Sequence, residues 1–309
     1  MKKLGLEHSE NTLGIGTPLL WYLVLVFLVG WGSWFATGGR NSGFLGLLGS
    51  VCPLVLAVAS ARLVGGRPSG IGWRPRVREN LKYYLLAWVG PGLVMLLGAA
   101  LYFLIFSSHF DWQLSSVLTL EDPQVGQLAE AAGGMDILRS QMRTRLVTDL
   151  LTTMLVGGPL AMFSAVFAEA GWIGFCWPEL SRRLGRGQAL LAGGVLFGLW
   201  NLPLIIGGYM YGTTYPGWPY LGAVTMCFMS ICRCTCLVWL TEKSGSIWPA
   251  ALCSAGLELV QLTPMPWTHM DAQLNLLLGP VPLGLVSGIP IMVLALLAAR
   301  DLLRSARQD

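Results

Sequence analysis

Five residues with chemically capable side chains stand inside long apolar stretches of this chain: Glu169, Asn201, Arg233, Ser254 and Glu258. Ionisable groups are costly inside a membrane and often mark a functional site there. Ser254 and Glu258 are four residues apart, so on a helix they would share one face. These residues predict an oxygen-rich polar pocket able to hold a cation or a polar ligand. The interpretation we favour is a relic, in which Glu169 is hydrogen-bonded to neighbouring helices and water reaches Glu258.

Histidine and cysteine do not supply a metal site in this sequence. The three histidines fall in predicted loops or in the N-terminal tail: His8, His109 and His269. Three cysteines alternate along one apolar stretch: Cys232, Cys234 and Cys236. On a helix only the first and third of these share a face, and zinc sites use wider spacing. We therefore expect no metal and no disulfide framework.

Helices that cross a membrane must position the polar residues. Only 12% of the 309 residues are charged, against about 25% in a soluble domain. A span needs about 20 mostly apolar residues. By that measure the sequence predicts an all-α membrane protein, an eight-helix transmembrane bundle. The predicted helices are 17–37, 43–64, 82–107, 146–172, 188–208, 218–241, 245–262 and 280–299.

The distribution of Lys and Arg predicts the orientation of the bundle. With the N-terminus in the cytoplasm, fifteen of the 20 basic residues lie in inside loops and tails and four lie outside. Positive charge is enriched on the cytoplasmic side. We expect a multi-pass protein of a cell membrane, of prokaryotic type, with both termini cytoplasmic. No basic stripe is interleaved with aromatics, which excludes nucleic acid as a partner.

The remaining basic residue, Arg233, stands inside a predicted helix. Such a residue usually faces the bundle interior and finds a partner. We predict that Arg233 faces Glu258 or Glu169, and depth along the helices slightly favours Glu258. The alternative is that its long side chain runs to the cytoplasmic head groups.

The segment 108–145 is the one sizeable loop, and it is predicted to lie outside. Asp122 followed by Pro123 is typical of a helix start, with Asp as the N-cap. A short amphipathic helix through Leu128, Ile137 and Leu138 would follow on the outer surface. The stretch 207–220 is rich in Tyr and Trp. We interpret it as an interfacial aromatic belt, with a partner-docking loop as the alternative.

Small residues predict where helices approach closely. The spacing Gly194-x-x-x-Gly198 lets a neighbouring backbone come near.

Three stretches resemble motifs of one family of intramembrane proteases. Phe167-Ala-Glu-Ala-Gly-Trp-Ile-Gly-Phe is similar to the motif EExGWRGF, and Phe197-Gly-Leu-Trp-Asn-Leu-Pro-Leu is similar to FGLWHLPL. Gly245 to Glu258 is similar to the stretch in which Asn follows His by four residues. The chain thus resembles the CPBP family, also called Abi or type II CAAX prenyl endopeptidase-like, over about residues 145–262. The resemblance implies an eight-helix bundle with a cavity in the middle of the membrane.

The resemblance also shows which functional residues are replaced. The six family positions are occupied by Ala168, Glu169, Ile173, Asn201, Ser254 and Glu258. Ala168 stands where the family has the Glu thought to activate water, and Ile173 stands where it has Arg. Asn201 and Ser254 stand in place of histidines, and Glu258 in place of Asn. Only Glu169 keeps the family residue, so no catalytic set is intact.

The family would imply zinc, but these replacements remove its ligands. A hydrolytic metal needs about three protein ligands and an open position, and amide and hydroxyl oxygens are weak ligands for a transition metal. We therefore expect no cofactor. The leading hypothesis is a pseudoprotease that acts as a membrane scaffold or regulator, with lipids and a membrane protein as partners. The alternatives are an active metalloendopeptidase of the CAAX-processing type and a lipid or small-molecule binder or transporter.

The chain divides into four predicted parts. Residues 1–16 form a cytoplasmic tail, and residues 17–144 the N-terminal helices and external loop. Residues 145–262 form the CPBP-like core, and residues 263–309 the last span and a cytoplasmic tail.

Overall fold

The computed structural model describes residues 17–38, 43–64, 71–119, 122–269 and 275–305. The predicted tail 1–16, with His8, lies outside the described residues. Helices dominate, and the single β-bridge recorded in the described part joins Phe110 to Thr268. The elements are α1 (Pro18–Ala36), α2 (Gly43–Leu63), α3 (Leu81–Ile105), η1 (Ser107–His109), α4 (Pro123–Ala132), α5 (Met135–Thr152), η2 (Thr153–Gly157), α6 (Gly158–Gly171), η3 (Trp172–Cys176), α7 (Trp177–Leu184), α8 (Arg186–Trp200), α9 (Leu202–Ile206), α10 (Tyr220–Ser244), α11 (Trp248–Val260), η4 (Met265–Trp267) and α12 (Ile289–Ser305).

Helical elements occupy all eight predicted ranges, but fewer of them meet the length of a membrane span. In the described residues four helices are long and apolar enough to cross a membrane: Pro18–Ala36, Leu81–Ile105, Met135–Leu184 and Tyr220–Ser244. A shorter apolar helix runs over Leu48–Leu63. Two predicted spans are interrupted. The range 188–208 divides at Asn201, just before Pro203, and the range 280–299 becomes helical only at Ile289. Proline cannot donate a backbone hydrogen bond, which accounts for the break at Pro203 and for the irregular start around Pro280 and Pro282.

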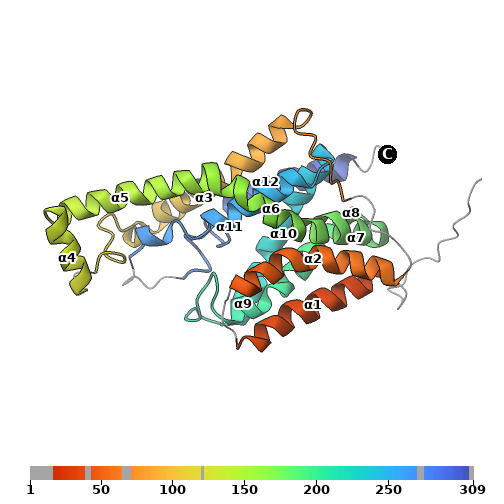
Figure 1. Ribbon diagram of the computed structural model, residues 1–309, viewed down its shortest axis with the longest axis horizontal. Helices are drawn as coiled ribbons and strands as arrows, with labels where there is room; N and C mark the ends of the chain where they lie inside the picture. The colour runs from red at the N-terminus through yellow and green to blue at the C-terminus, as the bar shows by residue number, and fades with distance from the viewer. Residues whose placement is uncertain (1–16, 39–42, 65–70, 120–121, 270–274, 306–309) are drawn as a thin grey trace, which may run out of the picture.

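The longest helical run is Met135–Leu184, which joins α5, α6 and α7 through two π-helical segments (Figure 1). Each π segment comes directly before a helix that has proline in its first turn, Pro159 in α6 and Pro178 in α7. The missing proline amide leaves the preceding turn free to widen from the α to the π pattern. The predicted helix 146–172 is therefore the middle of a column of 50 residues.

Glycine allows α8 and α10 to pack backbone against backbone, as the spacing predicts. A Cβ atom on Gly194 would lie 2.3 Å from the Cα of Ile231, and one on Gly198 would lie 2.5 Å from the Cα of Cys227. These distances leave no room for any side chain. Arg233 follows Ile231 by two residues on α10, and its guanidinium lies over the ring of Phe197 on α8.

The segment after α3 forms two helices and not one. Asp122 caps α4 as predicted, and its carboxylate accepts a hydrogen bond from the Gln124 amide at 2.9 Å. The helix then ends at Gly133, and Gly133 and Gly134 both have positive φ. The predicted single amphipathic helix is wrong because this glycine pair, which favours left-handed backbone, separates Leu128 from Leu138. Leu128 is exposed, whereas Leu138 packs in a small apolar cluster with Leu114, Leu118, Val125 and Ala129.

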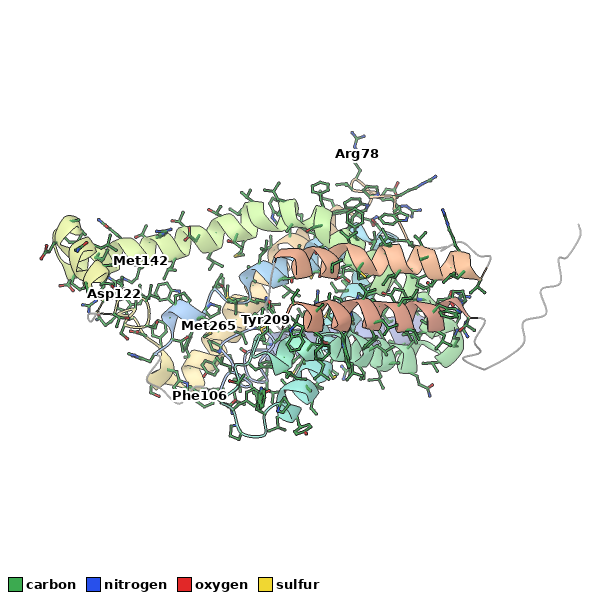
Figure 2. The ribbon with its side chains drawn as sticks, turned by 60° about the horizontal axis from the view of Figure 1, so that its bottom comes forward. Arg78, Phe106, Asp122, Met142, Tyr209 and Met265 are labelled. Carbon is green, nitrogen blue, oxygen red and sulfur yellow. The ribbon has the colours of Figure 1, made fainter. Side chains whose placement is uncertain are left out.

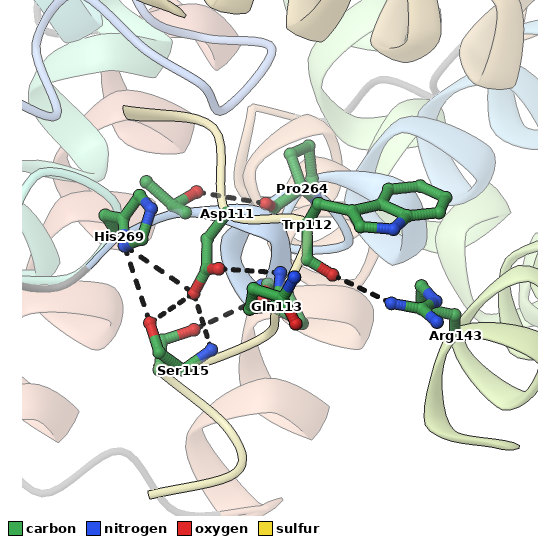
Figure 3. Close-up of polar contacts among 10 residues, drawn as sticks. Asp111, Trp112, Gln113, Ser115, Arg143, Pro264 and His269 are labelled. Atoms are coloured by element: carbon green, nitrogen blue, oxygen red, sulfur yellow. Dashed lines mark hydrogen bonds and ion pairs between the residues drawn. The ribbon is translucent and has the colours of Figure 1, made fainter. Parts of the chain in front are cut away.

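A buried aspartate ties this segment to the chain that follows α11 (Figure 3). The carboxylate of Asp111 accepts hydrogen bonds from the backbone amides of Gln113 (2.9 Å) and Ser115 (2.6 Å) and from the Ser115 hydroxyl. The Asp111 amide donates to the Trp267 carbonyl at 2.8 Å. Burial raises the pKa of Asp111, but the hydrogen bonds from Ser115 and the nearby His269 lower it, with a net lowering.

This group is not a serine-hydrolase triad. Ser115 and Asp111 both approach the same nitrogen of His269, Nδ1, at 3.4 and 3.7 Å. In a triad the histidine would bridge the other two residues through different nitrogens. The arrangement is instead a structural clamp.

The helices α4 and α5 extend away from the other helices (Figure 2). Asp122 and Met142, on α4 and α5, lie at the protruding end of the molecule, whereas Tyr209 lies near the ends of α1 and α2.

Candidate functional site

A cavity of about 510 Å³ lies between α1, α2, α6, α8, α10 and α11. This volume is within the usual range of small-molecule sites, about 300–1,000 Å³. All five residues of the expected polar pocket line it: Glu169, Asn201, Arg233, Ser254 and Glu258. Ala168 also faces the cavity. The fold thus brings together residues that are up to 89 positions apart in the sequence, Glu169 and Glu258.

Glu169 is the centre of the polar group. It lies near the end of α6 and is 3% exposed. One carboxylate oxygen, Oε1, accepts a hydrogen bond from the Ser254 hydroxyl at 2.6 Å and pairs with Nη2 of Arg233 at 3.4 Å. The same Nη2 donates to the Ser254 Oγ. Three helices, α6, α10 and α11, therefore meet at one charge-assisted network.

Arg233 pairs with a glutamate, as expected, but the partner is Glu169. Glu258, which depth favoured, forms no ion pair with it in the described residues. Counting residues along α10 and α11 estimates depth but not which faces of the helices oppose each other. The guanidinium lies over the Phe197 ring, 4.8 Å from the centroid. With the Arg233 side chain only 14% exposed, the head group does not extend to the membrane surface.

Asn201, which the motif resemblance compares with a histidine, lies at the end of α8. Its side-chain amide donates to the Phe197 carbonyl at 2.9 Å, which caps the helix. The amide nitrogen is therefore engaged in local structure.

Two lining residues were missed by the sequence reasoning, Tyr209 and Gln261. The Gln261 amide donates to the Tyr209 hydroxyl at 2.6 Å, and both residues line the cavity. Gln261 follows Glu258 by three residues, so helical spacing could have indicated it. Tyr209 comes from the aromatic stretch 207–220, whose position in three dimensions no local pattern reveals.

Ile173 stands apart from the other family positions. It is buried in the π segment η3 and belongs to the main apolar core. It lines a separate cavity of only about 20 Å³, with Trp172, Cys176 and Leu190 among its neighbours. The cation that pairs with Glu169 is instead Arg233, which comes from α10.

Glu258 lies in the last turn of α11 and is exposed toward the cavity. Among the residues described, no hydrogen bond or salt bridge involves its carboxylate. It interacts over longer distance with both Glu169 and Arg233. Its carboxylate therefore faces the cavity without a bonded partner among the described residues.

The donor set does not fit the zinc ion that the family implies. Within the described ranges no group of three His, Cys, Asp or Glu side chains is placed to hold a metal. His109 is hydrogen-bonded to Tyr102, and His269 belongs to the clamp around Asp111, so neither lines the cavity. Cys234 packs in the main core, whereas Cys232 and Cys236 face α3 and α12, as helical spacing predicts. The Oε1 atom of Glu169 is already engaged by Ser254 and Arg233, and the lining residues that the structure describes include no histidine.

Comparison with known proteins gives a match for the part of the chain that contributes the polar residues of the cavity. A search of curated proteins gave no match to the chain. A family model described as Type II CAAX prenyl endopeptidase Rce1-like matches residues 150–260. The match runs from the end of α5 to the end of α11 and includes all six family positions. Together with the apolar helices, it indicates a membrane protein. Residues 150–260 are therefore similar to this Rce1-like family, in agreement with the resemblance that the three motifs indicated.

Proposed function

We propose that this chain is a pseudoprotease of the CPBP family that acts in the membrane as a scaffold or regulator of a partner protein. The observation that carries the proposal is the network of Glu169, Arg233 and Ser254. The one carboxylate retained from the family motif is paired and hydrogen-bonded. Ser254, which donates to it, stands where the family has a histidine.

Hydrolysis needs groups that this cavity does not provide. A general base must be a titratable side chain within reach of the attacking water, and Ala168 offers only a methyl group. A catalytic metal needs about three protein ligands. Glu258 and Asn201 offer further oxygen atoms at the cavity wall, but its described lining residues include no histidine.

An active metalloendopeptidase would require Glu169 to leave Arg233 and act as the base or a ligand. That rearrangement would strand a guanidinium in the bundle interior, which is costly. The geometry therefore favours binding over turnover.

Metal analysis and a cleavage assay test the proposal. We expect purified protein to hold far less than one zinc per chain and to leave a prenylated CAAX peptide uncleaved. The matched variant carries Ala168→Glu, Asn201→His, Ser254→His and Glu258→Asn, which restores the family residues at four of the five replaced positions and should raise zinc affinity. Stoichiometric zinc in the unaltered protein, removable only by a chelator, would contradict the proposal.

Crosslinking tests the scaffold role. A photoreactive residue at Leu204, which lines the cavity, should capture a specific membrane protein in native membranes. The same residue at Leu104, 80% exposed on α3, serves as the control for random contact. Equal capture at both positions would argue against a partner bound at the cavity.

A further inference from the structure

The charges around the cavity do not balance. Glu169 and Arg233 form a pair, and this leaves the carboxylate of Glu258 as an additional negative charge on the wall. No side chain in the described parts of the molecule bonds to it. An ionisable group in such a position marks a binding site by default.

The position of Glu258 on its helix adds to the imbalance. It is two residues from the end of α11, which spans Trp248–Val260. The C-terminal end of a helix carries partial negative charge and favours cations. The nearby Glu169 also repels it, whereas Arg233 attracts it without contact. The local field around Glu258 is therefore suited to a positively charged group from outside the chain.

The rest of the cavity is suited to an apolar tail. Its lining includes Val29, Leu48, Leu204, Leu257, Leu259 and Leu283. Apolar surface of this kind is stabilised by covering it with hydrocarbon. A free inorganic cation would leave that surface uncovered.

Aromatic side chains add a surface that also attracts cations. Trp34, Trp200 and Tyr209 line the cavity, and a cation over an aromatic ring is attracted to its face. Trp200 is fixed in place, because its indole nitrogen donates to the Val26 carbonyl at 3.1 Å. Gly30 makes room for it, since a Cβ there would lie 2.4 Å from the same nitrogen.

We propose that the cavity binds an amphiphile with an alkylammonium head, whose counter-ion is Glu258 and whose tail lies along the apolar wall. The inference rests on the proposed non-proteolytic function, because it treats the cavity as a place that holds a ligand without cleaving it. A zwitterionic lipid and a free alkylamine share this chemistry.

The test compares probes of equal chain length and different charge. Octylammonium, octanol and octanoate are titrated into the purified protein in dodecyl maltoside, and thermal stability is followed against concentration. Partition into the micelle affects all variants alike, so differences between variants report the site. Octylammonium should stabilise the protein at concentrations at least about tenfold lower than octanol, and octanoate should not stabilise it.

Two variants locate the site. Glu258→Gln should raise the octylammonium concentration needed by about tenfold, whereas Glu130→Gln, an exposed glutamate on α4, should leave it unchanged. Ala168→Leu keeps the carboxylate but fills the cavity, and it should weaken binding too. Equal effects of octylammonium and octanol, or full binding to Glu258→Gln or Ala168→Leu, would overturn the inference.

Further experiments distinguish a lipid ligand from a free amine, and the ligand inference from the proposed function. Vesicle-derived phosphatidylcholine competing with octylammonium would identify a lipid head group as an occupant, and failure to compete would point to a free amine. Cleavage of a prenylated peptide would defeat the proposed pseudoprotease whatever the amine results. An inert protein that ignores octylammonium would defeat only the ligand inference.

Discussion

Replacement of Arg233 by methionine is the sharpest test of the polar network. Methionine keeps most of the side-chain length but removes the guanidinium, so the carboxylate of Glu169 loses its cation. The two side chains are 14% and 4% exposed, and solvent therefore screens little of the loss. Removing one partner of a buried pair costs about 3–5 kcal/mol. The lost contact with the Phe197 ring, at 4.8 Å, is a smaller part of that figure, about 0.5–2 kcal/mol.

A second substitution separates the charge effect from the packing effect. Glu169→Gln in the Arg233→Met background removes the stranded charge and leaves an amide oxygen for the Ser254 hydroxyl. The double variant should recover about 2–3 kcal/mol, because replacing both members of a buried pair is often nearly neutral. Glu258→Gln in the same background should recover less, since Glu258 is not the partner in the structure.

Unfolding in mixed micelles of dodecyl maltoside and sodium dodecyl sulfate, followed by tryptophan fluorescence, gives the free energy of unfolding for each variant. The four proteins of the Arg233 and Glu169 pair form a double-mutant cycle. Additive effects within about 0.5 kcal/mol would show that the two residues do not interact. Rescue by Glu258→Gln instead of Glu169→Gln would show that the pairing is different from the one described.

Three further changes test other parts of the fold. Gly194→Ala should lower the free energy of unfolding by about 1–3 kcal/mol, since overpacking costs that much, whereas Gly90→Ala, with open space around it, should not; equal effects would contradict the close helix contact. A cysteine replacing Gly126 in a cysteine-free background should react with an impermeant reagent from outside the cell, and reaction only from the cytoplasm would reverse the orientation. The pKa of Asp111 is lowered, so its stabilising effect is complete above the unfolded value of about 3.9 and is lost as the pH falls through the lower folded value. The protection factors of the 107–119 amides, which correct for the pH dependence of intrinsic exchange, should fall there in the unaltered protein and stay constant in Asp111→Asn; constant protection in the unaltered protein would refute the clamp.

Local patterns predicted much of this structure because they depend on neighbouring residues. Hydrophobic runs located helical elements in all eight ranges, Asp122 before Pro123 marked the start of α4, and Gly194 with Gly198 marked the close helix contact. The motifs predicted that Glu169 and Ser254 belong to one site, because the residues that surround them still resemble the family motifs.

The errors concern relations that a one-dimensional pattern does not contain. Arg233 pairs with a glutamate as predicted, but depth favoured Glu258, and the actual choice of Glu169 depends on how three helices are rotated against each other. Tyr209 enters the site through a loop whose path is set by distant contacts. Gly133 and Gly134 could have indicated the end of a helix. The prediction of one helix through Leu128 and Leu138 relied on hydrophobic spacing alone and ignored them.

The column from Met135 to Leu184 gives the molecule an unusual reach. At about 1.5 Å per residue, its 50 residues extend to about 75 Å, more than twice the roughly 30 Å of a hydrocarbon core. The helical arm that carries α4 is therefore mechanically continuous with the turn that holds Glu169. The widened turns η2 and η3 are the two points where such a rod bends most easily, because π segments interrupt the regular hydrogen-bond ladder. One flexible turn therefore lies on either side of Glu169. A displacement of α4 would be transmitted along the helix and would shift Glu169 at the cavity wall.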